Sequence, residues 1–336
     1  MTTVATDTRD HRVHLSVQDA WQLSQTTLLR IGYTEDNASI VSDHLMAAAL
    51  CGYEYSGLPK ILEIAESAKA RQPTSPMQVL KETSVSTLFD GGNHVGMVTL
   101  AHATNTVIEK AQAHGFGLVG VTNSWMSGRS AYYVEKIARA GLMAIHTVSS
   151  ASLVAPHGGA KASMGTNPIA FGFPGDPNPL IIDMGTSAFM ATELGLYKRR
   201  GELLPEGVAI DRDGQPTRDP EEARLGALLS LAGHKGFALS MAMKAFGILA
   251  GSHLNAAKDY GFLLIAFKPD LLISLDEYKA ALADMIARVK STPRLPGVDE
   301  IRIPSENSFR NFDANSQSGI VIDRHIHESL LALGAA

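Results

Sequence analysis

The residues with the clearest chemical potential lie between positions 157 and 187, where glycine-rich turns alternate with apolar segments. Glycine lets a backbone approach a ligand closely, and consecutive backbone N–H groups in such turns can bind anions. The glycines of the first turn are Gly158, Gly159 and Gly165. Thr166 and Asn167 follow them and add side-chain hydrogen-bonding groups. We therefore expect this turn to contact a ligand.

The end of the same stretch predicts a strand that carries an acid to the edge of a sheet. Residues 179–182 are apolar and typical of a buried strand. Ligands of α/β proteins usually bind at the carboxyl ends of strands. We expect the five residues that follow this strand to join the same site. They are Asp183, Met184, Gly185, Thr186 and Ser187.

Three stretches in this order make the chain resemble the malate/L-lactate dehydrogenase type 2 family: MGTNPIAFGFP (164–174), IDMGTS (182–187) and GHKGFALS (233–240). The similarity covers residues 13–323. The resemblance implies an α/β fold that is not a Rossmann fold, with a mixed-sheet cofactor domain and a small N-terminal helical domain. It also implies hydride transfer with NAD or NADP, a small-molecule substrate and a homodimer. In keeping with this, no G-x-G-x-x-G turn follows a first strand.

The resemblance also implies which residues bind the cofactor. A lysine at the start of a helix, as in GHKG, suits a pyrophosphate or a ribose phosphate. IPSEN (303–307) stands where the family carries a Pro-Gly-Glu element, so Ser305 replaces a glycine. The residues implied to bind the cofactor are Ser150, His157, Gly165, Thr166, Asn167, Asp183, Met184, Gly185, Thr186, Ser187, His234, Lys235, Gly236, Ser305, Glu306 and Asn307.

The chain departs from the family where a proton must be transferred. Family members usually carry a Ser-His-Gly turn, whereas this chain has Tyr55, Ser56 and Gly57 there, with Lys60 at the position of a family arginine. A second family histidine is replaced by Met126. Both usual acid/base histidines are therefore absent.

Two hypotheses explain how the protein could remain an active enzyme without these histidines. In one, Tyr55 or the neighbouring Tyr53 is the proton donor, with Lys60 lowering the phenol pKa and Ser56 relaying a proton; His94, in a glycine-flanked loop, is a further candidate. In the other, the substrate is an imine that needs little acid catalysis. The alternatives are a cofactor-binding homologue whose catalysis has lapsed, acting as a sensor or partner, and a non-redox use of bound NAD(P).

Three residues are expected to contact the substrate: His94, Met126 and Arg129. A guanidinium binds a carboxylate through two parallel hydrogen bonds, so Arg129 is suited to a 2-oxo or 2-imino acid. Met126, next to Trp125, makes the expected pocket apolar. We expect a 2-oxo or 2-hydroxy acid, a cyclic imino acid or a related ketone as substrate.

Composition narrows the remaining function classes. The chain has 336 residues, a formal net charge of −5 and a single cysteine, Cys51. A negative chain without a basic patch is not typical of a nucleic-acid or membrane-surface binder, and one cysteine excludes an internal disulfide. No signal core, membrane-length apolar run or metal-ligand spacing is found. We expect a cytoplasmic protein without a metal.

Periodicity predicts two domains. Residues 13–80 are expected to form a helical domain, completed by residues 290–336, and residues 81–289 an α/β NAD(P)-binding domain. Ser16, Thr34 and Ser274 are expected to cap helices. Residues 203–226 are polar and contain three prolines, which predicts a long surface excursion. Helices are expected at 16–32, 34–52, 58–70, 99–115, 132–141, 234–251 and 274–292, and strands at 84–90, 116–124, 142–150 and 262–267.

Overall fold

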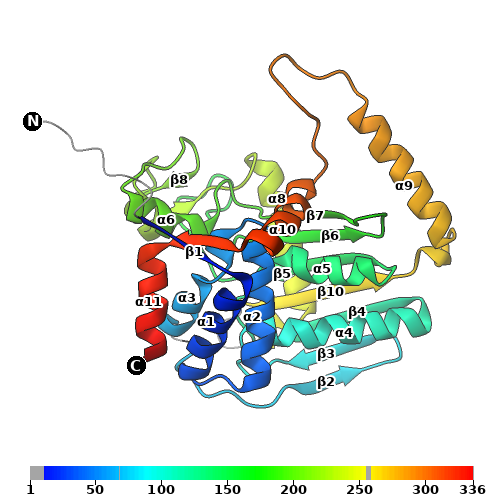
Figure 1. Ribbon diagram of the computed structural model, residues 1–336, viewed down its shortest axis with the longest axis horizontal. Helices are drawn as coiled ribbons and strands as arrows, with labels where there is room; N and C mark the ends of the chain where they lie inside the picture. Colours follow the sequence, from blue (N-terminus) through cyan, green and yellow to red (C-terminus); the bar gives the residue numbers. More distant parts are fainter. Residues whose placement is uncertain (1–10, 68, 255–258, 336) are drawn as a thin grey trace, which may run out of the picture. The chain divides into compact units, whose positions relative to one another are not determined.

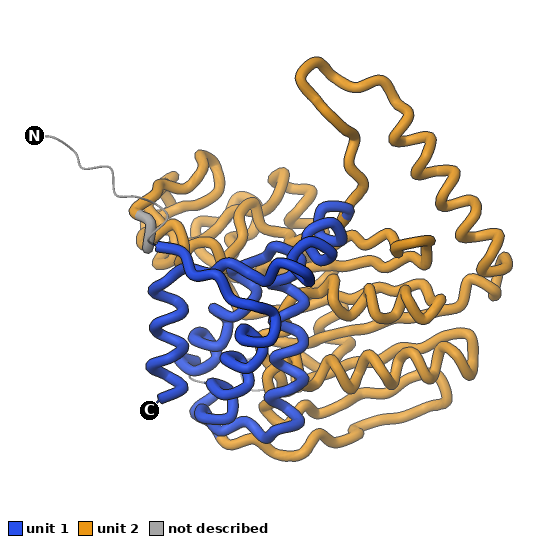
Figure 2. The backbone as a smooth tube through the Cα atoms, viewed as in Figure 1, with its two compact units in different colours: residues 1–72, 306–336 blue, residues 73–305 orange. Residues whose placement is uncertain are grey.

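The computed structural model describes residues 11–67, 69–254 and 259–335. The chain divides into two compact units, unit 1 with residues 1–72 and 306–336, and unit 2 with residues 73–305 (Figure 2). The division differs from the expected bounds at 80 and 290. Strand β2 (Gln78–Glu82) pairs with β3 (Ser86–Asp90), so this hairpin belongs to the sheet of unit 2.

Unit 1 is mainly helical, and its N-terminal helices begin where their capping residues predict. The Ser16 side chain accepts a hydrogen bond from the Asp19 N–H, and the Thr34 side chain accepts one from the Asn37 N–H. Both predicted caps are confirmed. The helices are α1 (Val17–Arg30), α2 (Glu35–Leu50), the 3-10 turn η2 (Glu54–Ser56), α3 (Lys60–Glu66), α10 (Glu306–Ser318) and α11 (Arg324–Ala335).

An N-terminal and a C-terminal segment pair inside unit 1. Strand β1 (Arg12–Leu15) pairs antiparallel with β11 (Ile320–Asp323), and Thr27 in α1 donates a hydrogen bond to the Leu330 carbonyl in α11. Fully buried apolar side chains from both segments form the core of this unit, among them Leu28, Val41, Leu45, Ile61, Ile64 and Leu330. The C-terminal segment is therefore an integral part of the helical unit.

Unit 2 is built on a mixed sheet flanked by helices, which confirms the predicted α/β fold. In the described residues this sheet has seven strands in the order β2-β3-β4-β10-β5-β6-β7. The strands not yet named are β4 (Phe116–Thr122), β5 (Met143–Ser149), β6 (Ile169–Phe173), β7 (Leu180–Met184) and β10 (Gly261–Phe267). β10 lies antiparallel between β4 and β5.

Helices cover both faces of this sheet. Strand side chains alternate between faces, so Gly117 and Gly120, three positions apart in β4, point to opposite faces. A Cβ at Gly117 would lie 2.5 Å from the Val107 carbonyl oxygen in α4 (Gly96–His114), whereas one at Gly120 would lie 3.2 Å from the Cα of Ala250, at the end of α8 (His234–Leu249). α4 and α8 therefore pack on opposite faces. Figure 1 shows α5 (Ser130–Arg139) beside α4 on the same face.

The region 188–230 corrects the expectation of a surface excursion over 203–226. It contains a core of its own, in which Leu204, Ala209 and Ala223 are fully or almost fully buried. The elements around this core are α6 (Ala191–Arg200), β8 (Ala209–Ile210), α7 (Pro220–Leu225) and β9 (Ala227–Leu228). The expectation failed because a few apolar residues among many polar ones are enough to bury these short elements.

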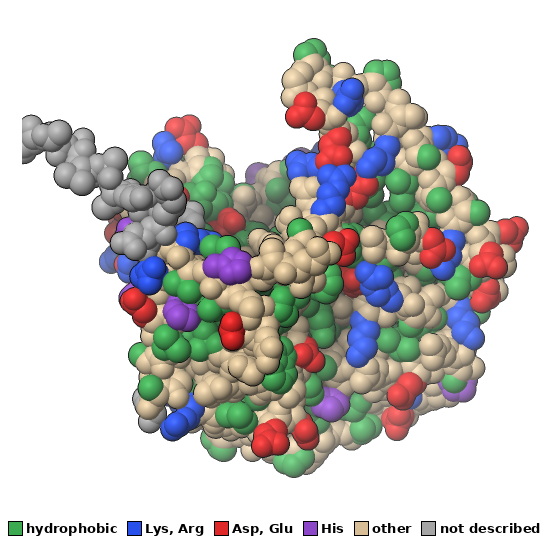
Figure 3. Space-filling view, viewed as in Figure 1, with side chains coloured by type: hydrophobic (Ala, Val, Ile, Leu, Met, Phe, Trp, Pro, Cys, Tyr) green, Lys and Arg blue, Asp and Glu red, His purple; other side chains and the backbone are tan. Residues whose placement is uncertain are grey.

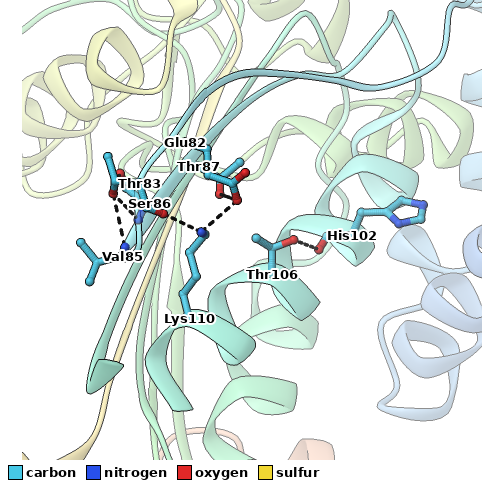
Figure 4. A network of polar contacts seen from close by, with 8 residues as sticks. All are labelled: Glu82, Thr83, Val85, Ser86, Thr87, His102, Thr106 and Lys110. Carbon is cyan, nitrogen blue, oxygen red and sulfur yellow. Dashed lines mark hydrogen bonds and ion pairs between the residues drawn. The ribbon is translucent and has the colours of Figure 1, made fainter. Parts of the chain in front are cut away.

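An ion pair anchors the edge hairpin β2–β3. The Lys110 Nζ atom of α4 lies 3.0 Å from Glu82 Oε1 and donates to the Thr83 carbonyl oxygen at 2.8 Å (Figure 4). The hydrogen bond and the charge of Lys110 lower the pKa of Glu82. Since Glu82 is exposed, we ascribe an orienting role rather than a large stabilisation to this pair.

Helix α9 (Leu275–Lys290) begins with the predicted cap at Ser274, which forms a complete capping box with Glu277. Leu282 is its buried residue and lies near Gly175, where a Cβ would be 3.6 Å away. Residues 291–300 are exposed, and Figure 3 shows hydrophobic and charged side chains mixed along this part of the surface. None of the described helices is long and apolar enough to cross a membrane.

Candidate active site

Four strands of unit 2 run in the same direction and end at one edge of the sheet. β3 is parallel to β4, and each of the pairs β4/β5 and β5/β7 is separated by one antiparallel strand. Their last residues are Asp90, Thr122, Ser149 and Met184. The segments that follow these strands therefore gather at a common edge, as the sequence predicts for residues 183–187.

At this edge, Asn167 fixes Ser150 and helix α8. Its Oδ1 atom accepts a hydrogen bond from the Ser150 N–H at 3.0 Å, and its Nδ2 atom donates to Ser240 Oγ at 3.0 Å. Asn167 is completely buried and has a φ of 33°. Its amide is thus used within the protein, so Asn167 positions Ser150 instead of presenting its side chain to a ligand.

Gly165 stands where no side chain fits. A Cβ at this position would lie 2.2 Å from Ser150 Oγ and 2.6 Å from Asn167 Oδ1. The glycine therefore allows the backbone of the 164–167 turn to lie directly against the end of β5, which is the close approach that the sequence predicts.

Backbone hydrogen bonds join this turn to the start of α8. The Thr186 N–H donates to the Thr166 carbonyl oxygen at 2.9 Å, and the Leu231 N–H donates to the Thr186 carbonyl oxygen at 2.9 Å. The Thr186 hydroxyl also donates to Thr166, and Ser187 forms a bridge with Ser230. Three of the predicted segments, 165–167, 183–187 and 234–236, are therefore adjacent.

The amino end of α8 carries three more of the residues predicted to bind the cofactor, His234, Lys235 and Gly236. His234 and Lys235 are exposed, and the His234 ring lies edge-on to His157 with 6.1 Å between centroids. Gly236 has no room for a Cβ, which would lie 2.1 Å from the Leu231 carbonyl oxygen. A helix start with an adjacent lysine attracts a phosphate, so the residues present fit a dinucleotide.

Asp183, at the end of β7, is tied to the start of α5. Its Oδ2 atom accepts a hydrogen bond of 2.8 Å from the Ala131 N–H. Although part of the residue remains accessible to solvent, desolvation by surrounding protein raises its carboxyl pKa, while this hydrogen bond and the nearby positive charge of Arg129 act in the opposite direction. Arg129 is therefore close enough to influence Asp183.

The segments after β3 and β4 also meet. Ser124 Oγ donates to the His94 carbonyl oxygen at 2.7 Å, and Trp125 Nε1 donates to the Asn93 carbonyl oxygen at 3.0 Å. Met126 adopts a φ of 53°, a left-handed conformation that is uncommon for its side chain. His94 and Met126 are both half-buried, so the structure places them in neighbouring loops at the same sheet edge as Arg129.

Lys244, which no sequence motif identifies, also lies at the end of β5. Its Nζ atom lies 3.4 Å from the Ser150 carbonyl oxygen. Partial burial lowers the pKa of Lys244, and the charge of Asp259 opposes this. It lies on the inner side of α8 with Ser240, four residues earlier. One sequence signal points to Lys244. It follows Ser240 by four residues, and residues four apart lie on the same face of a helix.

The predicted proton-transfer residues belong to unit 1. Tyr55 and Ser56 are half-buried in η2. Lys60 is buried, and its Nζ atom lies 2.5 Å from Glu63 Oε2. Its charge is thus compensated by Glu63, which weakens the expected effect of Lys60 on a phenol.

The last predicted element, 303–307, follows the loop after α9. Ser305 Oγ donates to the Ile181 carbonyl oxygen in β7 at 3.0 Å, and Ser305 has a φ of 67°. This left-handed backbone suits the glycine that Ser305 replaces. Glu306 and Asn307 open α10. Among the residues that the structure describes, no group of three or more His, Cys, Asp or Glu residues could hold a metal ion.

Comparison with known proteins agrees with this arrangement. A family model described as malate/L-lactate dehydrogenase matches residues 15–331. The chain is 32% identical over 324 residues to a malate dehydrogenase of Pyrococcus horikoshii, covering 90% of this chain and 89% of that protein. It is 29% identical to a Delta(1)-pyrroline-2-carboxylate/Delta(1)-piperideine-2-carboxylate reductase of Pseudomonas aeruginosa, covering 96% and 99%.

A solved structure shares the fold over almost the whole chain. The crystal structure of malate dehydrogenase from Entamoeba histolytica superimposes with a TM-score of 0.89 at 26% identity, covering 96% of this chain and 98% of that one. Family, sequence relatives and fold therefore agree, and the chain belongs to the malate/L-lactate dehydrogenase family and is an oxidoreductase.

Proposed function

We propose that this protein transfers a hydride between NAD or NADP and a 2-oxo or 2-hydroxy acid, a cyclic imino acid or a related ketone. The observation that carries this proposal is the convergence of the glycine turn, the end of β7 and the start of α8 at one sheet edge. When bound there, the nicotinamide supplies the hydride. Relatives named as malate dehydrogenase and as an imino-acid reductase support both substrate classes.

Different residues of the chain bind the cofactor and the substrate in this proposal. Lys235 and the first turn of α8 bind cofactor phosphate, Ser150 and residues 183–187 contact the cofactor, and Asn167 keeps Ser150 in place. Arg129 binds the substrate carboxylate, with His94 and Met126 beside it. Arg129 lies close to Asp183, so a substrate carboxylate bound by Arg129 would lie near the end of β7.

Tyr55 is our first candidate for the proton donor, with Ser56 as a relay. For a substrate that is already a protonated imine, this step is not required. The relatives do not favour the alternative of a lapsed, purely cofactor-binding homologue, because they are named as dehydrogenases and reductases.

The test follows absorbance at 340 nm, where reduced nicotinamide absorbs, with NADH and NADPH against 2-oxo acids, cyclic imino acids and bulky aryl ketones. Oxidation of either cofactor by one class establishes the activity and its substrate class. Tight cofactor binding without turnover would contradict it.

We also propose that the enzyme is a homodimer in which a second copy of the chain covers α8. Ser240, Lys244 and Gly247 face the sheet side of this helix. The opposite side is exposed and uncharged, with Ala238, Met241, Ala242, Ala245, Ile248 and Leu249. Helices that are apolar on all sides are normally buried. The alanines allow close approach, and an uncharged face does not repel its own copy.

A further inference from the structure

Met126 and Arg129, two residues proposed to contact the substrate, lie on one loop between β4 and α5, residues 123–129 (the β4–α5 loop). Elements of unit 2 hold this loop from three sides: α4 at its middle, α5 near its end and β7 directly after that end. A side chain binds a ligand well only when its own position is fixed by its surroundings. The contacts that fix Arg129 therefore matter for the proposed reaction.

The start of α4 fixes the middle of the loop through close packing. The Gly96 N–H donates a hydrogen bond of 2.6 Å to the Trp125 carbonyl oxygen. A Cβ at Gly96 would lie 2.8 Å from the Cα of Ser127 and 3.0 Å from the Met126 carbonyl oxygen. Because no side chain fits between them, the backbone of α4 lies directly against the backbone of the loop at Met126 and Ser127.

Tyr133, in the first turn of α5, reaches back to the same loop. Its hydroxyl donates a hydrogen bond of 2.5 Å to the Ser127 carbonyl oxygen, and the residue is only 1% exposed. The Tyr133 ring also lies edge-on to the buried His146 of β5, with 5.4 Å between the ring centroids. A buried hydroxyl on a closely packed ring gives the loop a fixed attachment point, two residues before Arg129.

β7 supplies the third contact, at the start of α5. Arg129 stands at the N-cap position of this helix, but a guanidinium has no acceptor and cannot cap the helix itself. The first N–H groups of a helix have no partner within it. Asp183, the fourth residue of β7, takes this role, because its Oδ2 atom accepts a hydrogen bond of 2.8 Å from the Ala131 N–H. A carboxylate is also favoured at a helix start by the helix dipole.

The same carboxylate lies close to Arg129. Burial raises the pKa of Asp183, while the Ala131 N–H and the positive charge of Arg129 lower it. Asp183 therefore contacts the backbone of α5 two residues after Arg129 and also interacts with the charge of Arg129.

We propose that Asp183 is a positioning residue for Arg129. Its carboxylate caps α5 and so places the guanidinium of Arg129 for a substrate carboxylate, and Tyr133 is a second positioning residue of the same loop. This inference rests on the proposed function, because the role of Arg129 toward a substrate belongs to that proposal.

Residues 183–187 thereby connect the two halves of the proposed site. The side chain of Asp183 bonds to α5, whereas the backbone of Thr186 bonds to Thr166 and Leu231, beside the proposed cofactor site. Hydride transfer needs the nicotinamide and the substrate in a fixed mutual position. One short segment at the end of β7 contacts the elements that would hold each of them.

The first measurement is hydrogen exchange of the full-length protein by mass spectrometry, without any ligand. In Asp183→Ala, exchange over residues 127–133 should be about fivefold to tenfold faster, the effect of losing a helix cap. Asp183→Asn keeps an oxygen that can accept the Ala131 N–H, so its exchange should stay slow. Tyr133→Phe is the second variant in case Asp183→Ala does not fold, and should speed exchange over the same residues. Lys136→Ala, which changes an exposed residue of α5, is the matched control and should leave this exchange unaltered.

The second measurement is a double-mutant cycle with a 2-oxo acid or a cyclic imino acid that the unchanged protein reduces. Asp183→Ala should raise KM for this substrate about tenfold relative to Asp183→Asn, because a displaced guanidinium loses its paired hydrogen bonds to the carboxylate. Since Asp183 acts through Arg129, adding Asp183→Ala to Arg129→Ala should change KM by less than about twofold. The cofactor Kd, measured by nicotinamide fluorescence, should stay within about threefold in Asp183→Ala.

Failure of this inference and failure of the proposed function give different results. If the unchanged protein oxidises neither NADH nor NADPH with any of these acids, the proposed function is wrong, and the positioning role fails with it. Only the positioning role is overturned if turnover is found but exchange is unaltered in Asp183→Ala and Tyr133→Phe. The same holds if the KM effects of Asp183→Ala and Arg129→Ala are additive, or if Asp183→Ala weakens cofactor binding instead of substrate binding.

Discussion

The Ser150 N–H donates to Asn167 Oδ1 at 3.0 Å, and the same Asn167 side chain donates through Nδ2 to Ser240 Oγ at 3.0 Å. One buried amide thus joins the end of β5 to α8. A local contact of this kind sets the position of a proposed cofactor ligand, Ser150, without itself touching the cofactor.

Asn167→Ala should lower the free energy of unfolding by about 1–3 kcal/mol, because it leaves buried partners without their hydrogen bonds. It should also weaken cofactor binding through displacement of Ser150. Urea denaturation and nicotinamide fluorescence measure the two effects. Ser163→Ala, in the same turn but exposed, is the control and should change neither. Unaltered stability of Asn167→Ala would show that the amide does not carry this role.

Lys235→Ala should raise the Kd for NADH or NADPH by about 10-fold to 100-fold, as expected for loss of a charge-assisted hydrogen bond. Lys279→Ala is a suitable control, since Lys279 pairs with Asp176 at 3.1 Å and lies on α9. Fluorescence titration with NADH and NADPH measures the Kd of both variants, and only Lys235→Ala should show the increase. Equal affinity in Lys235→Ala and the unchanged protein would remove Lys235 from the site.

Tyr55→Phe should slow ketone reduction by about 100-fold or more if the phenol is the general acid, while leaving cofactor affinity unaltered. Imine reduction should be affected much less, because a protonated imine needs no further proton. Steady-state rates with one substrate of each class measure this contrast. A near-normal rate with ketones would exclude Tyr55, and the Ser56→His variant then tests whether a histidine at this position raises the rate.

Stability should depend on pH through His146. This residue is completely buried in β5, its Nδ1 atom bonds the Leu263 carbonyl oxygen, and its Nε2 atom has no hydrogen-bond partner in the described part of the protein. Burial lowers the pKa of His146 to about 4, from an ordinary value of 6.5. The unfolded chain therefore binds a proton first as the pH falls, and the free energy of unfolding should decrease between pH 6.5 and pH 4, by about 3 kcal/mol in total.

The His146→Gln variant isolates this contribution, because the other titrating groups are common to both proteins. Urea denaturation at pH 7.5 and pH 4.5 should show a smaller difference in the variant. If the two proteins lose the same free energy of unfolding over this range, His146 is not the cause.

Ile248→Glu should dissociate the proposed dimer, because it places a charge in the centre of an apolar contact. Ile248 is 55% exposed in the single chain, so the substitution should leave the fold intact. Sedimentation velocity measures the mass, and circular dichroism checks the fold. A monomeric unchanged protein would refute the α8 contact directly.

Local patterns predicted the parts of the site that are contiguous in sequence. Gly165, Asp183 and the start of α8 lie where the glycine motifs and the strand pattern placed them, since tight turns and helix starts depend on a few neighbouring residues. The helix caps at Ser16, Thr34 and Ser274 were predictable for the same reason.

Contacts between distant residues were not predictable. Lys244 gains its significance from the carbonyl of Ser150, 94 residues away in sequence, and no local pattern contains that information. Asn167 was expected at the ligand, but a sequence does not tell which way an amide points, and this one is buried. Lys60 was expected to lower the pKa of a tyrosine, whereas in the structure it forms an ion pair with Glu63, one helical turn later.

The placement of β10 has a consequence for synthesis on the ribosome. β10 (Gly261–Phe267) separates β4 from β5, which precede it by more than a hundred residues. Until residue 267 has left the ribosome, the nascent chain exposes two unpaired strand edges in the middle of its sheet. Chains that stop before β10 are then expected to aggregate, and the sheet edge that gathers the glycine turn, Asp183 and α8 takes shape only after β10 has been synthesised.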